Sequence, residues 1–172
     1  KKLGVNVKIS KNHCEIIGVG LNGYKYKKNL ILNCGNSGTL SRLIMGLLVH
    51  SKSEIKITGD ASLSKRDFKR VVNPLSKFGA TFKIKSGKLP LTVKGTNYPF
   101  PIKYNENRGS AQCKTSVMLA ALNTRGKTII KAKKSRNHTE LLFKYLKLPI
   151  KIINNKNYDI IELSGVKKIN PI

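Results

Sequence analysis

An internal repeat constrains the fold of this chain more than any other feature. With an offset of 70 residues and no gap, Arg66 aligns with Arg136 and Gly95 with Gly165. The same offset pairs three apolar or aromatic positions, Leu75 with Tyr145, Phe82 with Ile152 and Val93 with Leu163. Two copies of one unit are therefore present, and we expect them to pack by the symmetry that the repetition suggests.

A second alignment, with an offset of 73, places Ser37-Gly38-Thr39 opposite Ser110-Ala111-Gln112, each at the start of a helix. The repeat then reads strand, small polar loop, helix, strand, loop with Arg, helix and two strands. Residues 3–18 resemble the closing strands of a further copy, so we expect the chain to start inside a unit.

Apolar periodicity predicts mixed strands and helices. Strands are predicted at 5–9, 14–19, 54–58, 81–84, 91–93, 128–132, 150–153 and 160–163. Helices are predicted at 39–50, 65–78, 111–122 and 139–146. The predicted class is α/β (α+β), built from repeated units. A G-x-G-x-x-G pattern, Gly18–Gly23, has no helix directly after it and is interpreted as a turn.

The composition is strongly basic. Lys and Arg number 34 against 8 Asp and Glu, a net charge of +26, and 40% of the 172 residues are apolar. Such a chain can bury a core. The charge favours an anionic partner, although richness in Lys, Asn and Ile also indicates an AT-rich coding sequence. Nucleic acid and small phosphorylated or carboxylated substrates fit equally well.

The sequence disfavours several classes of protein. The longest uncharged apolar stretch, Leu43–His50, is far shorter than the roughly 20 residues of a membrane span. The amino end is not a secretory signal. Cys14, Cys34 and Cys113 are far apart and odd in number, which argues against a disulfide framework or a zinc site and for a reducing cytoplasm. We find no catalytic triad, Walker loop, metal-ligand cluster or paired carboxylates, so the residues suggest binding more than catalysis.

The polar loops before equivalent helices should share one face, where helix N-termini attract anions. Asn36, Ser37 and Gly38 form one loop, and Ser110 and Gln112 belong to the other. Either loop can bind an anion through small residues and side-chain amides. Plain helix capping is the alternative.

Two further loops carry arginine. Arg66 follows Asp60, a candidate helix cap, and Arg136 follows Ser135. A guanidinium there can hold a carboxylate or phosphate with two hydrogen bonds, and a solvated Arg is the alternative. His138 fits a surface or capping residue better than a base.

Four segments, in this order and spacing, resemble a single family: Asn36-Ser37-Gly38-Thr39-Leu40-Ser41-Arg42, Gly59-Asp60-Ala61-Ser62-Leu63-Ser64-Lys65-Arg66, Ser110-Ala111-Gln112-Cys113-Lys114 and Ser135-Arg136-Asn137-His138-Thr139-Glu140. The family is EPSP synthase, 3-phosphoshikimate 1-carboxyvinyltransferase. It transfers the enolpyruvyl group of phosphoenolpyruvate to the 5-hydroxyl of shikimate 3-phosphate and releases phosphate, a step of the shikimate pathway to aromatic amino acids. It uses no metal or organic cofactor, and its two domains each contain three βαβαββ units.

The resemblance implies two groups of site residues. Phosphoenolpyruvate would be bound by Asn36, Gly38, Arg66 and Gln112. Shikimate 3-phosphate would be bound by Ser110, Ala111, Gln112, Ser135 and Arg136. The partners would be these two small molecules, with no nucleic acid or membrane, in a cytoplasmic enzyme that is monomeric at full length.

Two positions bear on this resemblance. Asp67 stands where the family usually has Pro after the arginine. Gly38 stands where glyphosate-tolerant enzymes often have Ala, so we expect the parent enzyme to be glyphosate-sensitive.

The resemblance also implies a fragment: residues 1–172 would be most of one substrate-binding domain, with the second domain absent. Residues 1–20 would end the first unit, 30–95 would form the second and 100–165 the third. This polypeptide should be inactive alone, with no catalytic residue of its own. The alternatives are UDP-N-acetylglucosamine enolpyruvyl transferase and a basic nucleic-acid-binding module, for which aromatic and Lys residues alternate at 24–28.

Overall fold

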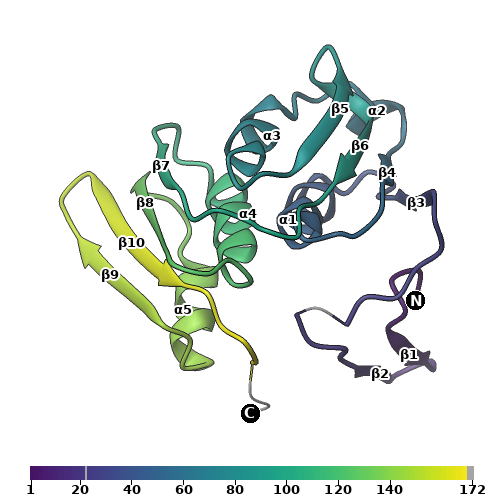
Figure 1. Cartoon of the computed structure of the whole chain (residues 1–172), viewed down its shortest axis with the longest axis horizontal. Coiled ribbons are helices and arrows are strands. Elements are labelled where there is room, and N and C mark those ends of the chain that lie inside the picture. Colours follow the sequence, from purple (N-terminus) through teal and green to yellow (C-terminus); the bar gives the residue numbers. More distant parts are fainter. Residues whose placement is uncertain (22, 170–172) are drawn as a thin grey trace.

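The computed structural model describes residues 1–21 and 23–169. Asn22, which lies within the predicted turn at 18–23, and residues 170–172 are outside the described part. The chain opens with a hairpin of β1 (Asn6–Ile9) and β2 (Cys14–Ile17), which pair antiparallel. Two larger α/β units follow, and their connection lies at residues 95–102 (Figure 1).

The first unit contains β3 (Leu30–Asn33), α1 (Gly38–Leu48), β4 (Ile55–Thr58), α2 (Ala61–Ser64), α3 (Lys69–Ser76), β5 (Thr81–Lys85) and β6 (Lys88–Lys94). The second contains β7 (Lys103–Glu106), α4 (Ala111–Ala121), β8 (Lys127–Lys133), α5 (His138–Tyr145), β9 (Ile150–Asn154) and β10 (Tyr158–Ser164). The strand order β3-β4-β6-β5 is repeated as β7-β8-β10-β9. In each sheet the first pair is parallel and the other two are antiparallel. The predicted class of repeated α/β units is confirmed.

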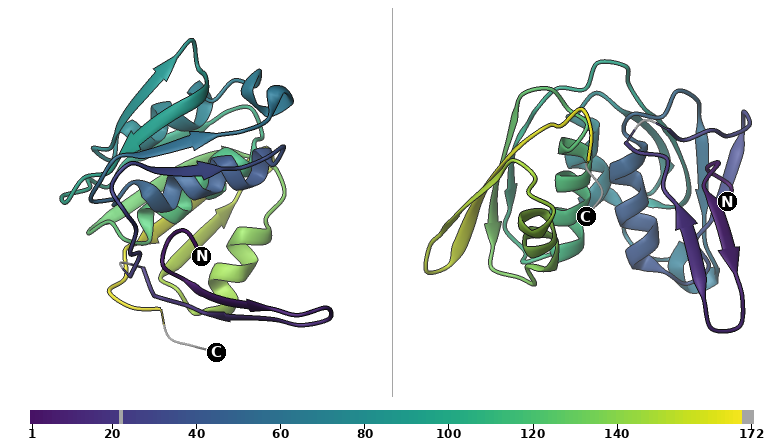
Figure 2. Two further views of the ribbon diagram at one scale, coloured as in Figure 1. Left: turned by 90° about the vertical axis from the view of Figure 1, so that its right-hand side faces the viewer. Right: turned by 90° about the horizontal axis from the view of Figure 1, so that it is seen from below.

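The helices α1 and α4 lie side by side between the sheets, which face outward (Figure 2, right). They approach closely at Gly46, where a Cβ would lie 2.2 Å from the backbone oxygen of Ser116. Ser116 Oγ of α4 donates a hydrogen bond to the backbone oxygen of Arg42 on α1, at 2.8 Å. This parallel arrangement brings the N-terminal ends of the two helices to one face of the molecule.

One predicted helix, 65–78, is wrong in part. The structure has a short α2 that ends at Ser64 and a separate α3 that begins at Lys69. Between them Phe68 is fully buried, and its amide donates to the backbone oxygen of Gly87. Asp67 Oδ1 accepts the amide of Lys69 at 2.9 Å. The hydrogen bond of the Asp67 side chain and the burial of Phe68 interrupt the helix that the apolar spacing predicted.

Candidate functional site

The N-terminal ends of α1 and α4 are capped by equivalent serines. Ser37 Oγ accepts the amide of Leu40 at 3.1 Å, and Ser110 Oγ accepts the amide of Cys113 at 3.3 Å. Both serines therefore cap a helix. Each hydroxyl keeps its own proton, because an oxygen that accepts from an amide can still donate to another group.

Two guanidinium groups converge on Gly38. A Cβ at this glycine would lie 2.8 Å from Nη1 of Arg42 and 2.8 Å from Nη1 of Arg66. Arg66 Nη2 also donates to Asn36 Oδ1 at 3.2 Å. The predicted residues Asn36, Gly38 and Arg66 are thus brought together, and the missing side chain of Gly38 leaves the space that the guanidinium groups need.

Arg42 belongs to this cluster although the sequence analysis did not select it. It is 8% exposed, and its guanidinium lies over the ring of Phe68, 5.3 Å from the centroid. Its Nη1 donates to the backbone oxygen of Gly38 at 3.3 Å. Burial lowers the pKa of Arg42 below its usual value, yet an arginine in a protein remains charged. A charged residue on the buried face of a helix was the available signal.

Gln112 links the two units across the helix pair. Its Oε1 accepts from Arg42 Nη1 at 2.8 Å, and its Nε2 donates to Thr39 Oγ1 at 2.7 Å. The amide therefore connects the N-terminus of α4 to the arginine cluster on α1. This is a suitable place for a side chain that contacts two neighbouring ligands.

A hollow of about 210 Å³ lies beside Gln112. It is lined by Thr39, Leu43, Ala111, Gln112, Thr115, Arg136, His138 and Thr139, none of which is acidic. Arg136 is exposed at its edge. The Oγ of Ser135 is buried and has no hydrogen-bond partner among the described residues.

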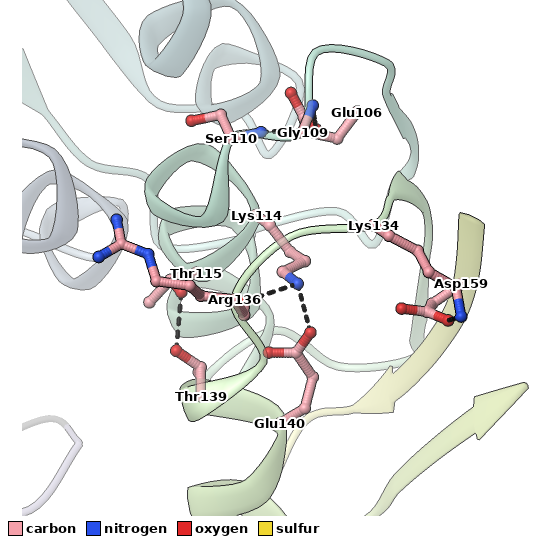
Figure 3. A network of polar contacts seen from close by, with 10 residues as sticks. All are labelled: Glu106, Gly109, Ser110, Lys114, Thr115, Lys134, Arg136, Thr139, Glu140 and Asp159. Atoms are coloured by element: carbon pink, nitrogen blue, oxygen red, sulfur yellow. Dashed lines mark hydrogen bonds and ion pairs between the residues drawn. The ribbon is translucent and has the colours of Figure 1, made fainter. Parts of the chain in front are cut away.

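Two buried carboxylates shape the loops around this hollow (Figure 3). Glu106 accepts the amides of Arg108 at 3.2 Å, Gly109 at 2.7 Å and Ser110 at 2.9 Å, which fixes the loop before α4. Glu140 forms an ion pair with Lys114. Sequence reasoning missed both, because their burial depends on contacts between distant segments.

A larger cavity, of about 890 Å³, lies at the other end of α1. Tyr24, His50, Phe100 and Arg125 are among its lining residues, and none of the predicted site residues contributes to it. In the described part of the chain no group of three His, Cys, Asp or Glu side chains is placed to hold a metal ion. None of the described helices is long and apolar enough to span a membrane.

Comparison with known proteins points to one family. The profile of EPSP synthase (3-phosphoshikimate 1-carboxyvinyltransferase) matches residues 1–171. The 3-phosphoshikimate 1-carboxyvinyltransferase of Ruegeria sp. (strain TM1040) is 40% identical over 158 residues, which are 91% of this chain and 35% of the relative. The one from Ruthia magnifica is 43% identical over 155 residues, 90% of this chain and 35% of the relative.

A solved structure points to the same family. EPSP synthase from Acinetobacter baumannii superposes with a TM-score of 0.85 at 34% identity, over 98% of this chain and 38% of that one. The chain thus spans little more than a third of the length of these proteins.

Proposed function

The chain belongs to the EPSP synthase family, and on that basis we propose that the face at the N-terminal ends of α1 and α4 binds shikimate 3-phosphate and phosphoenolpyruvate for enolpyruvyl transfer. The protein would work in the cytoplasm, as a monomer at full length and without nucleic acid. The observation that carries the proposal is the continuous polar path from Arg66 and Arg42 through Gln112 to the hollow beside Arg136.

The geometry supports a division of this face between two anions. Arg66, with Asn36 and Gly38, would hold phosphoenolpyruvate, because its exposed guanidinium can pair with a carboxylate or phosphate. Ser110, Ala111, Ser135 and Arg136 would hold shikimate 3-phosphate. Gln112 lies between the two groups and would contact both ligands.

In the proposed reaction a bond forms between the 5-hydroxyl oxygen and the enolpyruvyl carbon, and the bond from that carbon to the phosphate oxygen breaks. The O–H bond of the hydroxyl also breaks, and in the overall balance its proton leaves with the inorganic phosphate. The role of this chain's residues is to hold two polyanions close together in the required orientation. Positive side chains and helix N-termini offset their mutual repulsion. We assign no acid or base for proton transfer to the described residues.

Calorimetric titration of shikimate 3-phosphate into the chain tests this proposal. We expect saturable binding that weakens at least about tenfold in Arg136→Ala, the loss of one charge-assisted contact, and comparably in Gln112→Ala. Arg125→Ala is the matched control, because it removes the same charge at the opposite end of α1. An equal loss in Arg125→Ala would show that only net charge attracts the ligand, and the proposal would fail.

A further inference from the structure

A buried ion pair joins α4 and α5 beside the hollow. Lys114 of α4 and Glu140 in the first turn of α5 are in contact, with Nζ 2.5 Å from Oε1. Their side chains are 1% and 4% exposed. Figure 3 shows the pair next to the backbone of Arg136. Nothing in the proposed function uses these two residues.

Stability alone does not explain this pair. Removing two charges from water costs free energy that their attraction only partly returns, and apolar residues of similar volume often replace such a pair without loss. Lys114 is also surrounded on α4 by buried residues such as Cys113 and Val117. An apolar side chain would pack well at position 114. The presence of a lysine there is therefore explained best by a specific contact that its amine makes.

The amine makes that contact with the arginine loop. Lys114 Nζ donates a hydrogen bond to the backbone oxygen of Arg136 at 3.1 Å. A second bond between the same helices, Thr115 Oγ1 to Thr139 Oγ1 at 2.7 Å, lies alongside. The guanidinium of Arg136 points away from the ion pair (Figure 3) and borders the hollow. Thus Lys114 holds the backbone of Arg136 while the side chain remains free to meet a ligand.

We propose that Lys114 and Glu140 are positioning residues for Arg136: Glu140 orients the Lys114 amine, and the amine fixes the Arg136 carbonyl so that the guanidinium reaches a phosphate in the hollow. The identity of that phosphate, shikimate 3-phosphate, rests on the proposed function. An arginine on a loose loop must lose backbone freedom when it binds an anion. Fixing the loop beforehand removes that cost and tightens binding.

The first test measures the order of the loop without any ligand. The variant Lys114→Met/Glu140→Leu replaces the pair with apolar side chains of similar size and should fold. By ¹⁵N relaxation we expect the Arg136 and Asn137 amides to become more mobile than in the unmodified chain. The control is Lys127→Met/Glu162→Leu, which removes an ion pair on β8 and β10 whose side chains are 56% and 23% exposed. Unchanged mobility of residues 136–137 in the first variant would overturn the proposal.

A second variant is used if Lys114→Met/Glu140→Leu does not fold. Lys114→Gln/Glu140→Gln keeps a neutral hydrogen-bonding pair inside the protein, but the shorter glutamine at 114 no longer reaches the Arg136 carbonyl. The same rise in mobility is expected, and its absence would count against the proposal in the same way.

The second test asks whether the pair acts through Arg136. Shikimate 3-phosphate is titrated into four proteins: the unmodified chain, the apolar-pair variant, Arg136→Ala, and the combination of both. We expect the apolar pair to weaken binding about tenfold when Arg136 is present and less than about twofold when it is absent. An equal loss in both backgrounds would mean a merely structural role.

The proposed function and the positioning role of Lys114 and Glu140 can be disproved independently of each other. If the unmodified chain does not bind shikimate 3-phosphate, the proposed function is wrong, and the relaxation experiment still decides whether Lys114 positions the loop.

Discussion

At the residue scale, Gly38 sets how closely two arginines can approach one helix end. In Gly38→Ala the added methyl group would lie 2.8 Å from a nitrogen of each guanidinium, and both must move. We expect phosphoenolpyruvate to bind about tenfold more weakly, equivalent to about 1.4 kcal/mol, in a calorimetric titration at fixed shikimate 3-phosphate.

Gly18→Ala is the matched control for that substitution, because a Cβ at Gly18 meets no atom of the described residues within 4 Å. Binding should be unchanged there. If Gly38→Ala also binds phosphoenolpyruvate as the unmodified chain does, the arginines at Gly38 are not the site.

Because of His50, we expect the free energy of unfolding to depend on pH. Burial lowers the pKa of His50, opposed by the hydrogen bond between its Nε2 and the Ala120 oxygen. Since the folded pKa lies below the usual value of about 6.5, the unfolded state binds the proton more readily. The contribution of His50 is complete above about pH 6.5 and is lost as the pH falls below that value toward the folded pKa.

Urea unfolding at pH 7.5 and pH 5.5 measures this effect, because most carboxylates titrate below that window. The free energy of unfolding should fall between the two pH values, and the fall should be smaller in His50→Gln. A fall of equal size in the variant would assign the effect to other groups.

At the element scale, the sequence predicted most helices and strands to within a few residues. Ser37 and Ser110 are side-chain caps, a local signal that spacing and residue type reveal. The repeat predicts a strand before each small polar loop, but apolar spacing did not give the residues of β3 and β7, whose pairing with β4 and β8 is decided by distant segments.

The candidate site was predicted to a similar extent. The residues brought together at the helix ends, Asn36, Gly38, Arg66 and Gln112, came from motifs in loops. Arg42, Glu106 and Glu140 could not be selected in that way. Their importance arises from burial against the other unit or a neighbouring loop, which loop motifs do not show. For Arg42 the available signal was its position on the apolar face of a predicted helix.

The repeat itself can be tested at two glycines. The backbone of Gly95 packs against Ser51, and that of Gly165 against Thr124, so that a Cβ would collide with backbone atoms in both places. Both sites follow the last strand of a unit, β6 or β10. We expect Gly95→Ala and Gly165→Ala each to lower the free energy of unfolding by about 1–3 kcal/mol, measured with urea.

The losses of unfolding free energy in Gly95→Ala and Gly165→Ala are to be compared with each other. Similar losses would indicate equivalent packing in the two units. A large loss in only one would contradict the structural equivalence of the two glycines.

At the scale of the whole molecule, two α/β units place their helices inside and their sheets outside, and this arrangement aligns α1 with α4 (Figure 2). The basic charge is spread far beyond the site. With 34 basic and 8 acidic residues, most Lys and Arg side chains have no carboxylate to pair with, and their repulsion opposes folding.

Salt should therefore stabilise the fold. Raising NaCl from 10 mM to 150 mM shortens the screening length from about 30 Å to about 8 Å. We expect the midpoint of urea unfolding to rise with an unchanged slope. A midpoint that falls with salt would mean that attractive ion pairs outweigh the repulsion.

The central claim is that the helix ends of the two units form one anion site, and chemical-shift mapping with shikimate 3-phosphate tests it most directly. In 150 mM NaCl, the largest amide shifts of the ¹⁵N-labelled chain should fall at residues 36–39, 110–113 and 135–139. Shifts centred instead on the cavity near Tyr24, His50 and Phe100, or spread over the lysine-rich strands, would contradict the claim.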